Sequence, residues 1–504
     1  MNQNRFHILL LLSVFVVATC GLIYELVAGT LASYLLGDSV TQFSTIIGVY
    51  LFSMGIGSWL SKHFEKNLLS WFIQIELLVG LVGGTSSTLL FFLFEQTESF
   101  RLLLYMMVML TGTFVGLEIP LLMRILENRF EFKDLVSKVF TFDYIGALLA
   151  SVIFPLLLIP HLGIIRTSYF FGLLNIAVAI IVLWQFKKEI SWQKQLKVQA
   201  ILCMVVLLAG FVYADKIMSF TESMAYPDKI IYSKTTHYQR IIITKNQREL
   251  RLFLNGNLQF SSADEYRYHE ALVHPGLAAL PYAKKVLVLG GGDGLAVREI
   301  LKYPNVQSVT LVDLDKEMTS MFTNNSMLSA LNLHSFSSPK VKVINTDAFT
   351  WAKKQQNEQY DFIVIDFPDP SNFSIGKLYS NRFYSEIEKL LSPEGIVVIQ
   401  STSPYVAPKS FWCIDKTLQS VGLNTVPYHV YVPSFGEWGY VMGMKKPSYN
   451  LPGQFPAGLK FVNQESLKQM LYFPGDMAKV PTEINKLNNQ VLVHYFEDEW
   501  AKFL

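Results

Sequence analysis

The sequence predicts a chain in two parts: a multi-pass α-helical membrane domain, followed by an α/β domain that combines a small antiparallel β-sheet with a doubly wound parallel sheet. Three observations predict this fold class. Long apolar runs fill the chain up to about residue 215. The rest has the mixed composition of a globular protein, and short apolar strands alternate there with helical segments. The overall composition agrees, because 51% hydrophobic and 16% charged residues are too apolar for a soluble protein of 504 residues.

The membrane part contains apolar stretches that reach the length of about 20 residues needed to cross a bilayer. We expect about seven helices, near residues 8–30, 40–61, 70–94, 102–123, 140–160, 164–186 and 198–214. The first stretch follows a weakly basic start, as in a signal peptide, but further spans follow at once and favour a retained helix. The last is the shortest, so an interfacial or re-entrant position is an alternative to a crossing.

Four carboxylates lie within these stretches or at their ends: Glu25, Glu76, Glu118 and Asp143. Ionisable groups inside a membrane are costly and therefore count as functional candidates, here for a path that a cation could use. The alternative is that they cap helix ends or pair with a residue such as Arg124.

Charge and cysteine content exclude several classes of function. The formal net charge is +2, from 42 basic and 40 acidic residues, so no nucleic-acid partner is indicated. Three cysteines, Cys20, Cys203 and Cys413, provide neither a disulfide framework nor a thiolate metal site. We expect no metal.

The second part begins with alternating runs at 240–244 and 250–254, followed by the hairpin signal Asn255-Gly256, so a small antiparallel sheet is expected at about 230–260. A helix is expected over 264–280. Strands are then expected at 285–289, 308–312, 341–345, 361–365 and 395–400, with helices at 295–303, 315–323, 347–355 and 382–391 between them. The predicted domains are 1–215, 216–262, 263–450 (Rossmann-like) and a C-terminal extension, 451–504.

A glycine-rich turn follows the first of these strands. Residues 290–294 read Gly-Gly-Gly-Asp-Gly, and glycines such as Gly290 and Gly292 allow a tight turn and a close approach of the backbone to a ligand. The next strand ends in Asp313, about 20 residues downstream, where an acidic side chain accepts hydrogen bonds from ribose hydroxyls. The sequence therefore predicts a nucleoside site.

More carboxylates follow the later strands. Asp347 ends the third strand, and Asp366 and Asp369 follow the fourth in a loop stiffened by prolines. Any one of them could be a helix cap. Together with Asp293 and Asp313, however, they all map to one edge of one sheet, where open α/β folds bind their ligands. The predicted site is anionic, so its ligands should be cations.

These residues resemble the spermidine synthase (polyamine aminopropyltransferase) family over about residues 232–443. The resemblance is carried by the following motifs: Tyr238-Gln239, the segments 254–259 and 264–270, Gly290 to Gly294 with Arg298-Glu299, the acidic strand ends and the segment 432–439. The apolar part is similar to the membrane-embedded bacterial branch of that family.

The resemblance implies that decarboxylated S-adenosylmethionine is a co-substrate and that its aminopropyl group passes to putrescine or a related amine, giving spermidine and methylthioadenosine. It also implies roles for individual residues. The nucleoside would be held by Gln239, Gly290, Gly292, Asp313, Asp347 and Ala348. The aminopropyl and amine channel would be lined by Tyr268, His269 and Asp293. Asp366 would be the catalytic base, and the acceptor would be held by Asp369 and a tyrosine, Tyr428 or the nearby Tyr431.

The loop at 366–370 departs from the family pattern, since it reads Asp-Phe-Pro-Asp-Pro where the family usually has serine or threonine between the two aspartates. The acceptor therefore stays open, as does a homo-oligomeric state. Two other functions stay open as well. One is a class I methyltransferase, which Asp293 disfavours because it would repel the carboxylate of ordinary S-adenosylmethionine. The other is a membrane polyamine transporter or sensor whose soluble domain only binds.

Orientation in the membrane rests on two arguments that conflict. Basic residues cluster at 62–66, 124–138 and 187–197, so these loops and the N-terminus should be cytoplasmic. A seventh crossing would then place the soluble part outside, away from a cofactor made in the cytosol. We expect a protein of the cell membrane whose catalytic domain is cytoplasmic.

Overall fold

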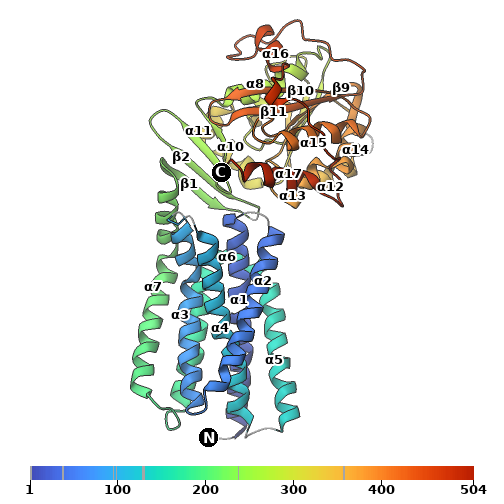
Figure 1. Cartoon of the computed structure of the whole chain (residues 1–504). Helices are drawn as coiled ribbons and strands as arrows, with labels where there is room; N and C mark the ends of the chain where they lie inside the picture. Colours follow the sequence, from blue (N-terminus) through green and yellow to red (C-terminus); the bar gives the residue numbers. More distant parts are fainter. Residues whose placement is uncertain are drawn as a thin grey trace. The chain divides into compact units, whose positions relative to one another are not determined.

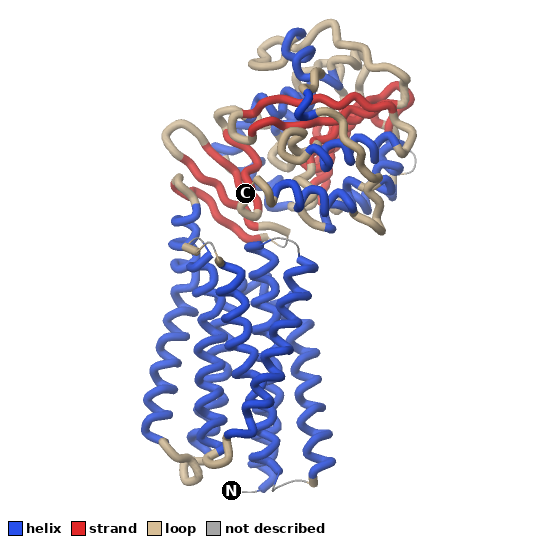
Figure 2. The backbone as a smooth tube through the Cα atoms, in the orientation of Figure 1, coloured by secondary structure: helices blue, strands red, loops and turns tan. Residues whose placement is uncertain are grey.

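The computed structural model describes residues 3–36, 39–94, 96–97, 99–127, 131–236, 238–355 and 358–503. The chain divides into two compact units, Met1–Pro227 and Asp228–Leu504. Figure 1 shows both units, and Figure 2 shows that the regular structure of the first is helical whereas strands occur in the second.

The helices of the first unit cover the predicted apolar stretches. They are α1 (Gln3–Leu36), α2 (Ser39–Leu60), α3 (Leu68–Phe94), α4 (Phe100–Leu126), α5 (Phe132–Ile153), α6 (Ile159–Gln185) and α7 (Gln193–Ala225). Within the described residues, six helical stretches are long and apolar enough to cross a membrane. One of these is the 54-residue stretch Phe132–Gln185, which joins α5 and α6 through the π-helical turn η3 (Phe154–Leu158) and is kinked at Gly163.

The last helix is longer than its apolar core suggested. Helix α7 has 33 residues, and Gln193–Met218 within it has the length and composition of a span. The segment 198–214 is therefore part of a longer continuous helix, and whether that helix crosses the membrane or lies in the interface stays a prediction. The predicted domain boundary after residue 215 falls inside this helix, and the four-part division of the chain stays a proposal.

Glycines let the helices of the first unit pack closely. A Cβ atom on Gly57 would lie 2.0 Å from the Thr113 carbonyl oxygen, so only glycine lets α2 approach α4 at this point. A Cβ atom on Gly83 would lie 2.7 Å from the ring of Tyr24, which places α1 against α3. Gly55 has open space around it and carries no such contact.

The second unit begins with the predicted antiparallel sheet. In the described residues it has the strand order β1-β2-β3-β4, with bounds Lys229–Thr235, Arg240–Lys245, Leu250–Leu254 and Asn257–Ser261. Asn255 and Gly256 form the turn between β3 and β4, both with positive φ. One face of this sheet, including Ile241 and Leu252, packs on apolar side chains of helix α10 (Lys316–Asn324).

The larger sheet confirms the predicted doubly wound arrangement. In the described chain its order is β10-β11-β9-β8-β5-β6-β7. Strands β5 (Lys285–Gly290), β6 (Ser308–Asp313), β7 (Val341–Asn345), β8 (Tyr360–Asp366) and β9 (Leu391–Gln400) are parallel. The order reverses between β5 and β8, and such a switch point is where open α/β sheets bind ligands.

Two strands that the sequence did not predict extend this sheet. They are β10 (Asn424–Val432) and β11 (Gly436–Met444), and β11 pairs antiparallel with β9. The sheet is therefore mixed, although mostly parallel. The longer helices around it are α8 (Glu265–Leu277), α9 (Leu295–Ile300), α11 (Ser326–Leu331), α12 (Ala348–Lys354), α14 (Asn381–Leu390) and α15 (Pro408–Gln419).

The C-terminal extension packs on this second unit. It contains α16 (Gln464–Met470) and α17 (Val491–Trp500). The buried carboxylate of Glu270 in α8 accepts hydrogen bonds from the backbone N–H groups of Lys460, Phe461 and Val462, at 2.8, 2.8 and 2.9 Å. The carboxylate of Glu499 accepts from the backbone N–H groups of Lys409 and Ser410 at the start of α15.

Candidate active site

The glycine-rich turn lies at the switch point of the sheet. Gly290 ends β5 directly opposite Asp366, which ends β8. Gly290 has φ +82°, and a Cβ atom on it would lie 2.1 Å from the Asp366 carbonyl oxygen. A Cβ atom on Gly292 would lie 2.8 Å from a carboxylate oxygen of Asp313. Any side chain at either position would displace one of the two carboxylate-bearing strand ends.

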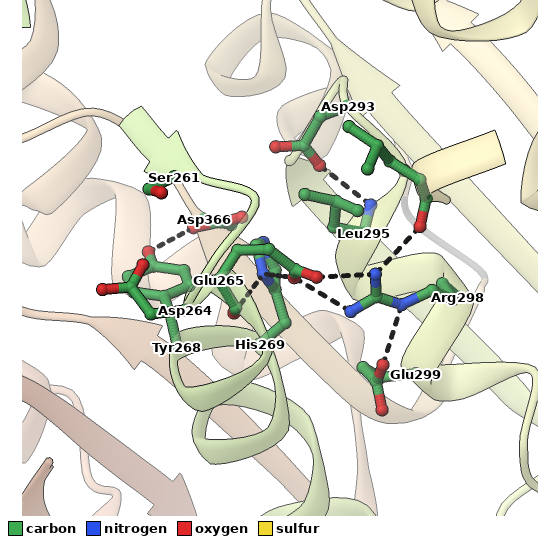
Figure 3. A network of polar contacts seen from close by, with 12 residues as sticks. Ser261, Asp264, Glu265, Tyr268, His269, Asp293, Leu295, Arg298, Glu299 and Asp366 are labelled. Carbon is green, nitrogen blue, oxygen red and sulfur yellow. Dashed lines mark hydrogen bonds and ion pairs between the residues drawn. The ribbon is translucent and has the colours of Figure 1, made fainter. Parts of the chain in front are cut away.

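Asp366, the predicted base, is held by a tyrosine. The Tyr268 hydroxyl donates to Asp366 Oδ1 at 2.6 Å, as Figure 3 shows. Burial raises the pKa of Asp366 from 3.8 to about 6; the charge of Asp293 acts in the same direction, whereas His269 and the Tyr268 hydrogen bond lower it. At neutral pH the carboxylate is thus mostly ionised, yet it is a stronger base than an exposed aspartate.

His269 is fixed by an ion-pair chain. Its Nδ1 lies 2.9 Å from Glu265 Oε2, one helical turn earlier in α8. Arg298 binds both oxygens of that carboxylate, at 2.8 and 2.9 Å (Figure 3). Burial alone would lower the pKa of His269, but the hydrogen bond and charge of Glu265, with Asp293 and Asp366, raise it to about 9. An imidazolium therefore faces the two aspartates.

Asp293 lies between the other acidic groups. It is 9% exposed, and its Oδ1 accepts from the Leu295 backbone N–H at 2.9 Å. Burial raises its pKa, and the charge of His269 opposes that change. Since its own charge raises the pKa values of both Asp313 and Asp366, Asp293 stands close to each of them. Three carboxyl groups from the ends of three neighbouring strands, β8, β5 and β6, are thus concentrated in one place.

Asp313 forms the other end of this acidic cluster. Burial raises its pKa to about 7, although its Oδ1 accepts from the Asp315 backbone N–H at 2.8 Å. Gln239, from the loop before β2, donates to Asp315 Oδ2 at 3.1 Å. The structure thus places Gln239 beside the β6 strand end, through a carboxylate that the sequence reasoning did not name.

Asp347 is engaged by protein groups. It caps helix α12, accepting from the Thr350 backbone N–H at 2.7 Å, and its other oxygen accepts from Lys377 Nζ at 3.1 Å. Burial would raise its pKa, but these donors outweigh burial and lower it. Ala348, the first residue of α12, is buried. The helix-cap alternative considered for the strand-end aspartates therefore applies to Asp347.

Asp369 belongs to a separate polar group. Gln400 Nε2, at the end of β9, lies 3.3 Å from Asp369 Oδ1, 2.9 Å from the Tyr379 hydroxyl and 2.6 Å from the Phe367 carbonyl oxygen. The Tyr379 hydroxyl in turn donates to the Phe367 and Pro368 carbonyl oxygens. Burial raises the pKa of Asp369 to about 7, whereas hydrogen bonding by Gln400 lowers it. Gln400 and Tyr379 thus fix the loop after β8 by hydrogen bonds to its oxygen atoms.

Tyr428 is a core residue in this structure. It is fully buried, stacks on Tyr440 at 5.2 Å, and its hydroxyl donates to the Ala271 carbonyl oxygen at 2.8 Å. Tyr440 also contacts the ring of Tyr268 at 5.6 Å. Tyr428 therefore supports the Tyr268 ring through one intervening residue, and a direct contact with an acceptor stays a prediction.

The sequence reasoning assigned no role to the residues that hold the site: Glu265, Arg298, Asp315, Tyr379 and Gln400. A signal existed for one of them, because Glu265 and His269 are spaced i, i+4 and such pairs meet on a helix. The others come from segments far apart in sequence.

Comparison with known proteins adds to this geometry. Residues 265–452 match the family model for the spermine/spermidine synthase domain. The chain is 53% identical over 495 residues to the polyamine aminopropyltransferase of Leptospira interrogans, covering 98% of this chain and 99% of that protein. It is 51% identical over 506 residues to polyamine aminopropyltransferase 2 of Ralstonia nicotianae, covering 99% of each. The spermidine synthase of Thermotoga maritima, known from a crystal structure, covers 49% of this chain and 85% of its own, with 26% identity and a TM-score of 0.45.

Proposed function

Because the chain belongs to the polyamine aminopropyltransferase family, we propose that it transfers the aminopropyl group of decarboxylated S-adenosylmethionine to putrescine, giving spermidine and methylthioadenosine. The observation that carries this proposal is the partly buried Asp366–Tyr268 pair at the switch point of the sheet, beside Asp293 and the glycine turn.

Asp366 acts as the general base in this proposal. An alkyl amine has a pKa near 10, so putrescine arrives protonated and cannot attack carbon until a proton is removed. Asp366 binds the ammonium group and accepts the proton. The amine nitrogen then forms a bond to the carbon beside the sulfonium, and the carbon–sulfur bond breaks. The bonding electron pair stays on sulfur, which becomes a neutral thioether.

The acidic cluster offsets the repulsion between the two cationic substrates. A sulfonium and an ammonium brought together in a buried site repel each other, and preorganised carboxylates lower that energy. Asp293 and Asp366 supply this charge in the proposal, with Tyr268 and His269 lining the same channel. The charge of the His269 imidazolium, fixed by Glu265, opposes the rise in pKa that burial causes at both aspartates and so favours their ionised forms.

The nucleoside and the acceptor occupy opposite sides of this channel in the proposal. Asp313 and Gln239 hold the ribose end, Gly290 and Gly292 let the backbone approach the ligand, and Asp347 and Ala348 border the adenine. Asp369 and Tyr428 hold the distal end of the acceptor. The Phe367–Pro368 pair is the part of this pocket that differs from the usual family loop, so it would set the acceptor preference.

Product analysis tests the reaction and the acceptor together. The full-length protein in detergent or lipid is incubated with decarboxylated S-adenosylmethionine and, separately, with putrescine, cadaverine, spermidine and agmatine. The proposal expects methylthioadenosine release and spermidine formation with putrescine. Methylthioadenosine with another amine would overturn the acceptor alone. Methyl transfer from ordinary S-adenosylmethionine, or binding of amines without turnover, would support the methyltransferase or the transporter and sensor alternatives.

We also propose that the soluble unit faces the cytoplasm, where the nucleoside co-substrate is made. With the N-terminus inside, this orientation requires an even number of crossings. Six candidate spans in the described residues give an even number when Phe132–Gln185 crosses once, but the basic loop at 187–197 would then lie on the outer side. That stretch, however, would be about 80 Å long as a straight helix, against about 30 Å for the hydrocarbon core. If both of its arms cross, the soluble unit lies outside.

Cysteine labelling of intact cells decides between these orientations. The three native cysteines are buried, so background labelling is low. A cysteine in place of Tyr472, which is 71% exposed in the soluble unit, should react with a membrane-impermeant maleimide only after lysis. A cysteine at Lys66, in a basic loop, is the matched control for the cytoplasmic side. Labelling of the Tyr472→Cys variant before lysis would show that the soluble unit is outside.

A further inference from the structure

Two of the four carboxylates predicted in the apolar stretches are fully buried in the helical unit. Glu76 in α3 and Glu118 in α4 are both 0% exposed. Glu25 and Asp143, by contrast, are partly exposed. The buried pair therefore needs an explanation that neither helix capping nor contact with the bilayer surface provides, because both residues lie well inside their helices.

One of the two carboxyl groups, that of Glu76, accepts a hydrogen bond from a protein side chain. Asn175 Nδ2 in α6 donates to Glu76 Oε2 at 2.8 Å. The Tyr24 hydroxyl in α1 donates to the other end of the same amide, Asn175 Oδ1, at 3.0 Å. This second bond fixes the orientation of the amide, so that its N–H and not its oxygen faces Glu76. A chain of hydrogen bonds thus runs from Tyr24 in α1 through Asn175 in α6 to one carboxyl oxygen of Glu76 in α3.

The other carboxyl group lacks a donor. In the part of the chain that the structure describes, no group donates to Glu118 Oε1, Glu118 Oε2 or Glu76 Oε1. Yet helices α3 and α4 pack against each other, and the two carboxyl groups are close enough for each to influence the protonation of the other. Carboxylate oxygens only accept hydrogen bonds, so two ionised groups at this separation would repel each other in an apolar interior. A positive charge must lie between them.

Within the described residues, no Lys or Arg side chain donates to either carboxyl group. Arg124 donates to the Ser61 carbonyl oxygen, and Arg166 pairs with Asp215. The titratable groups near the pair are Cys20 and Tyr24 from α1 and Tyr50 from α2, which are neutral at neutral pH. The Tyr50 hydroxyl donates to the Gly21 carbonyl oxygen, so it is not directed to the pair.

The space around the pair is small. One turn along α3 from Glu76, a Cβ atom on Gly80 would lie 2.8 Å from the Gly172 carbonyl oxygen, so α3 and α6 touch through their backbones. Among the described residues, no group of three or more His, Cys, Asp or Glu side chains could hold a metal ion. Close packing and only two acidic ligands favour the smallest cation.

We propose that Glu76 and Glu118 form a proton-binding site in the core of the helical unit, in which the two carboxyl groups share one proton. The shared proton gives Glu118 the donor that the protein does not provide, and the Asn175 amide stabilises the charge remaining on Glu76. Carboxyl groups at such positions are those from which proton relays of membrane proteins are built. The helical unit would thus have a ligand of its own, independent of the aminopropyl transfer.

Infrared spectroscopy of the full chain in lipid nanodiscs tests this site. The C=O stretch of a protonated carboxyl group is separate from the carboxylate bands and shifts in D₂O. At neutral pH, parent protein and an Asp143→Asn control should show the same protonated-carboxyl signal. In Glu118→Gln the signal of the pair should vanish completely, because the new amide donates to Glu76 and leaves it ionised. The double variant Glu76→Gln/Glu118→Gln should match Glu118→Gln.

Other outcomes would overturn the proposal. A signal that falls only by half in Glu118→Gln would mean that each carboxyl group holds its own proton. A parent signal that disappears when sodium or spermidine is added would mean that the pair binds that cation. Equal signals in the parent and the double variant would mean that the pair holds no proton. Elution of Glu118→Gln as a single species and a helical circular-dichroism signal equal to that of the parent show that the helical unit of the variant is folded.

Discussion

Replacing Asp366 with asparagine separates proton acceptance from shape. The amide retains the size of the carboxyl group, and its oxygen can still accept from the Tyr268 hydroxyl, but it cannot take a proton from an amine. General-base catalysis contributes about 10²–10⁴-fold, so kcat should fall by that factor. The affinity for methylthioadenosine should change little, because the predicted nucleoside contacts lie at the β6 strand end.

The pH dependence of kcat/KM provides a second quantitative test of Asp366 as the base. Because burial raises the pKa of Asp366 to about 6, about nine-tenths of the groups are ionised at pH 7 and about one-tenth at pH 5. The ionised form is the base, so kcat/KM of the parent should fall about tenfold as the pH drops from 7 to 5. The residual activity of Asp366→Asn should not show this fall at acidic pH. In Tyr268→Phe the fall should begin at a higher pH, because the lost hydrogen bond had lowered the pKa of Asp366.

Stability provides a check that the variant is folded. A carboxyl group whose pKa is raised on folding destabilises the folded protein once it is ionised there. This cost is absent below pH 3.8 and complete above about 6, where a rise of about two pKa units corresponds to about 3 kcal/mol. Asp366→Asn should therefore melt at a higher temperature than the ligand-free parent at pH 7.5. Turnover within a few-fold of the parent by a variant with this stability would refute the role of Asp366 as the base.

Three further predictions concern the neighbouring groups and the unit as a whole. Asp313→Ala should weaken methylthioadenosine binding, measured by calorimetry, with little change in the KM for the amine; unchanged nucleoside affinity would mean that the ribose is held elsewhere. Glu265→Gln should lower the free energy of unfolding by about 3–5 kcal/mol, because it removes the carboxylate that binds two N–H groups of the largely buried Arg298 and leaves that guanidinium only its ion pair with Glu299. Glu465→Gln, which removes an exposed ion pair with Lys468, should change it by less than about 1 kcal/mol; equal changes of the two variants in urea unfolding would contradict this account. A fragment from about residue 220 onward should be soluble and active, since its two sheets enclose their own core; an inert fragment would show that the helical unit completes the site.

The parts of the fold that follow from periodicity were predictable. Each predicted parallel strand occurs in the structure, and β7 has the predicted bounds. The antiparallel pair β10 and β11 was not predicted. Strand β10 contains Pro427, which argues against a strand unless it lies at a sheet edge, and β10 does lie at the edge. Only the assembled sheet reveals that position.

The site was predictable as far as strand ends determine it. Asp293, Asp313 and Asp366 follow β5, β6 and β8 and stand close together, as the alternation of strands and helices indicated. The same pattern could not distinguish Asp347 from these three aspartates, although its carboxylate is engaged in a helix cap and an ion pair. A strand-end position fixes where a carboxylate lies, but its partners depend on the loop that follows.

The supporting contacts needed the three-dimensional structure. Arg298 meets Glu265 across 33 positions of sequence, and Gln400 meets Asp369 across 31. The pairing of Glu76 with Glu118 likewise depends on which helices are neighbours. Hydrophobic periodicity gives the buried face of one element at a time and carries no information on which other element covers it.

The anchoring of the C-terminal extension has a consequence for any shortened version of the protein. Glu270, which holds the extension by three backbone N–H groups, is in the same helix as Tyr268 and His269. Deleting residues after 450 would leave a carboxylate that is now 1% exposed without its donors, in the same helix as two of the predicted site residues. An affinity tag can be added after the last residue, but a truncated version should replace Glu270 as well, or its loss of activity will be mistaken for a catalytic role of the deleted segment.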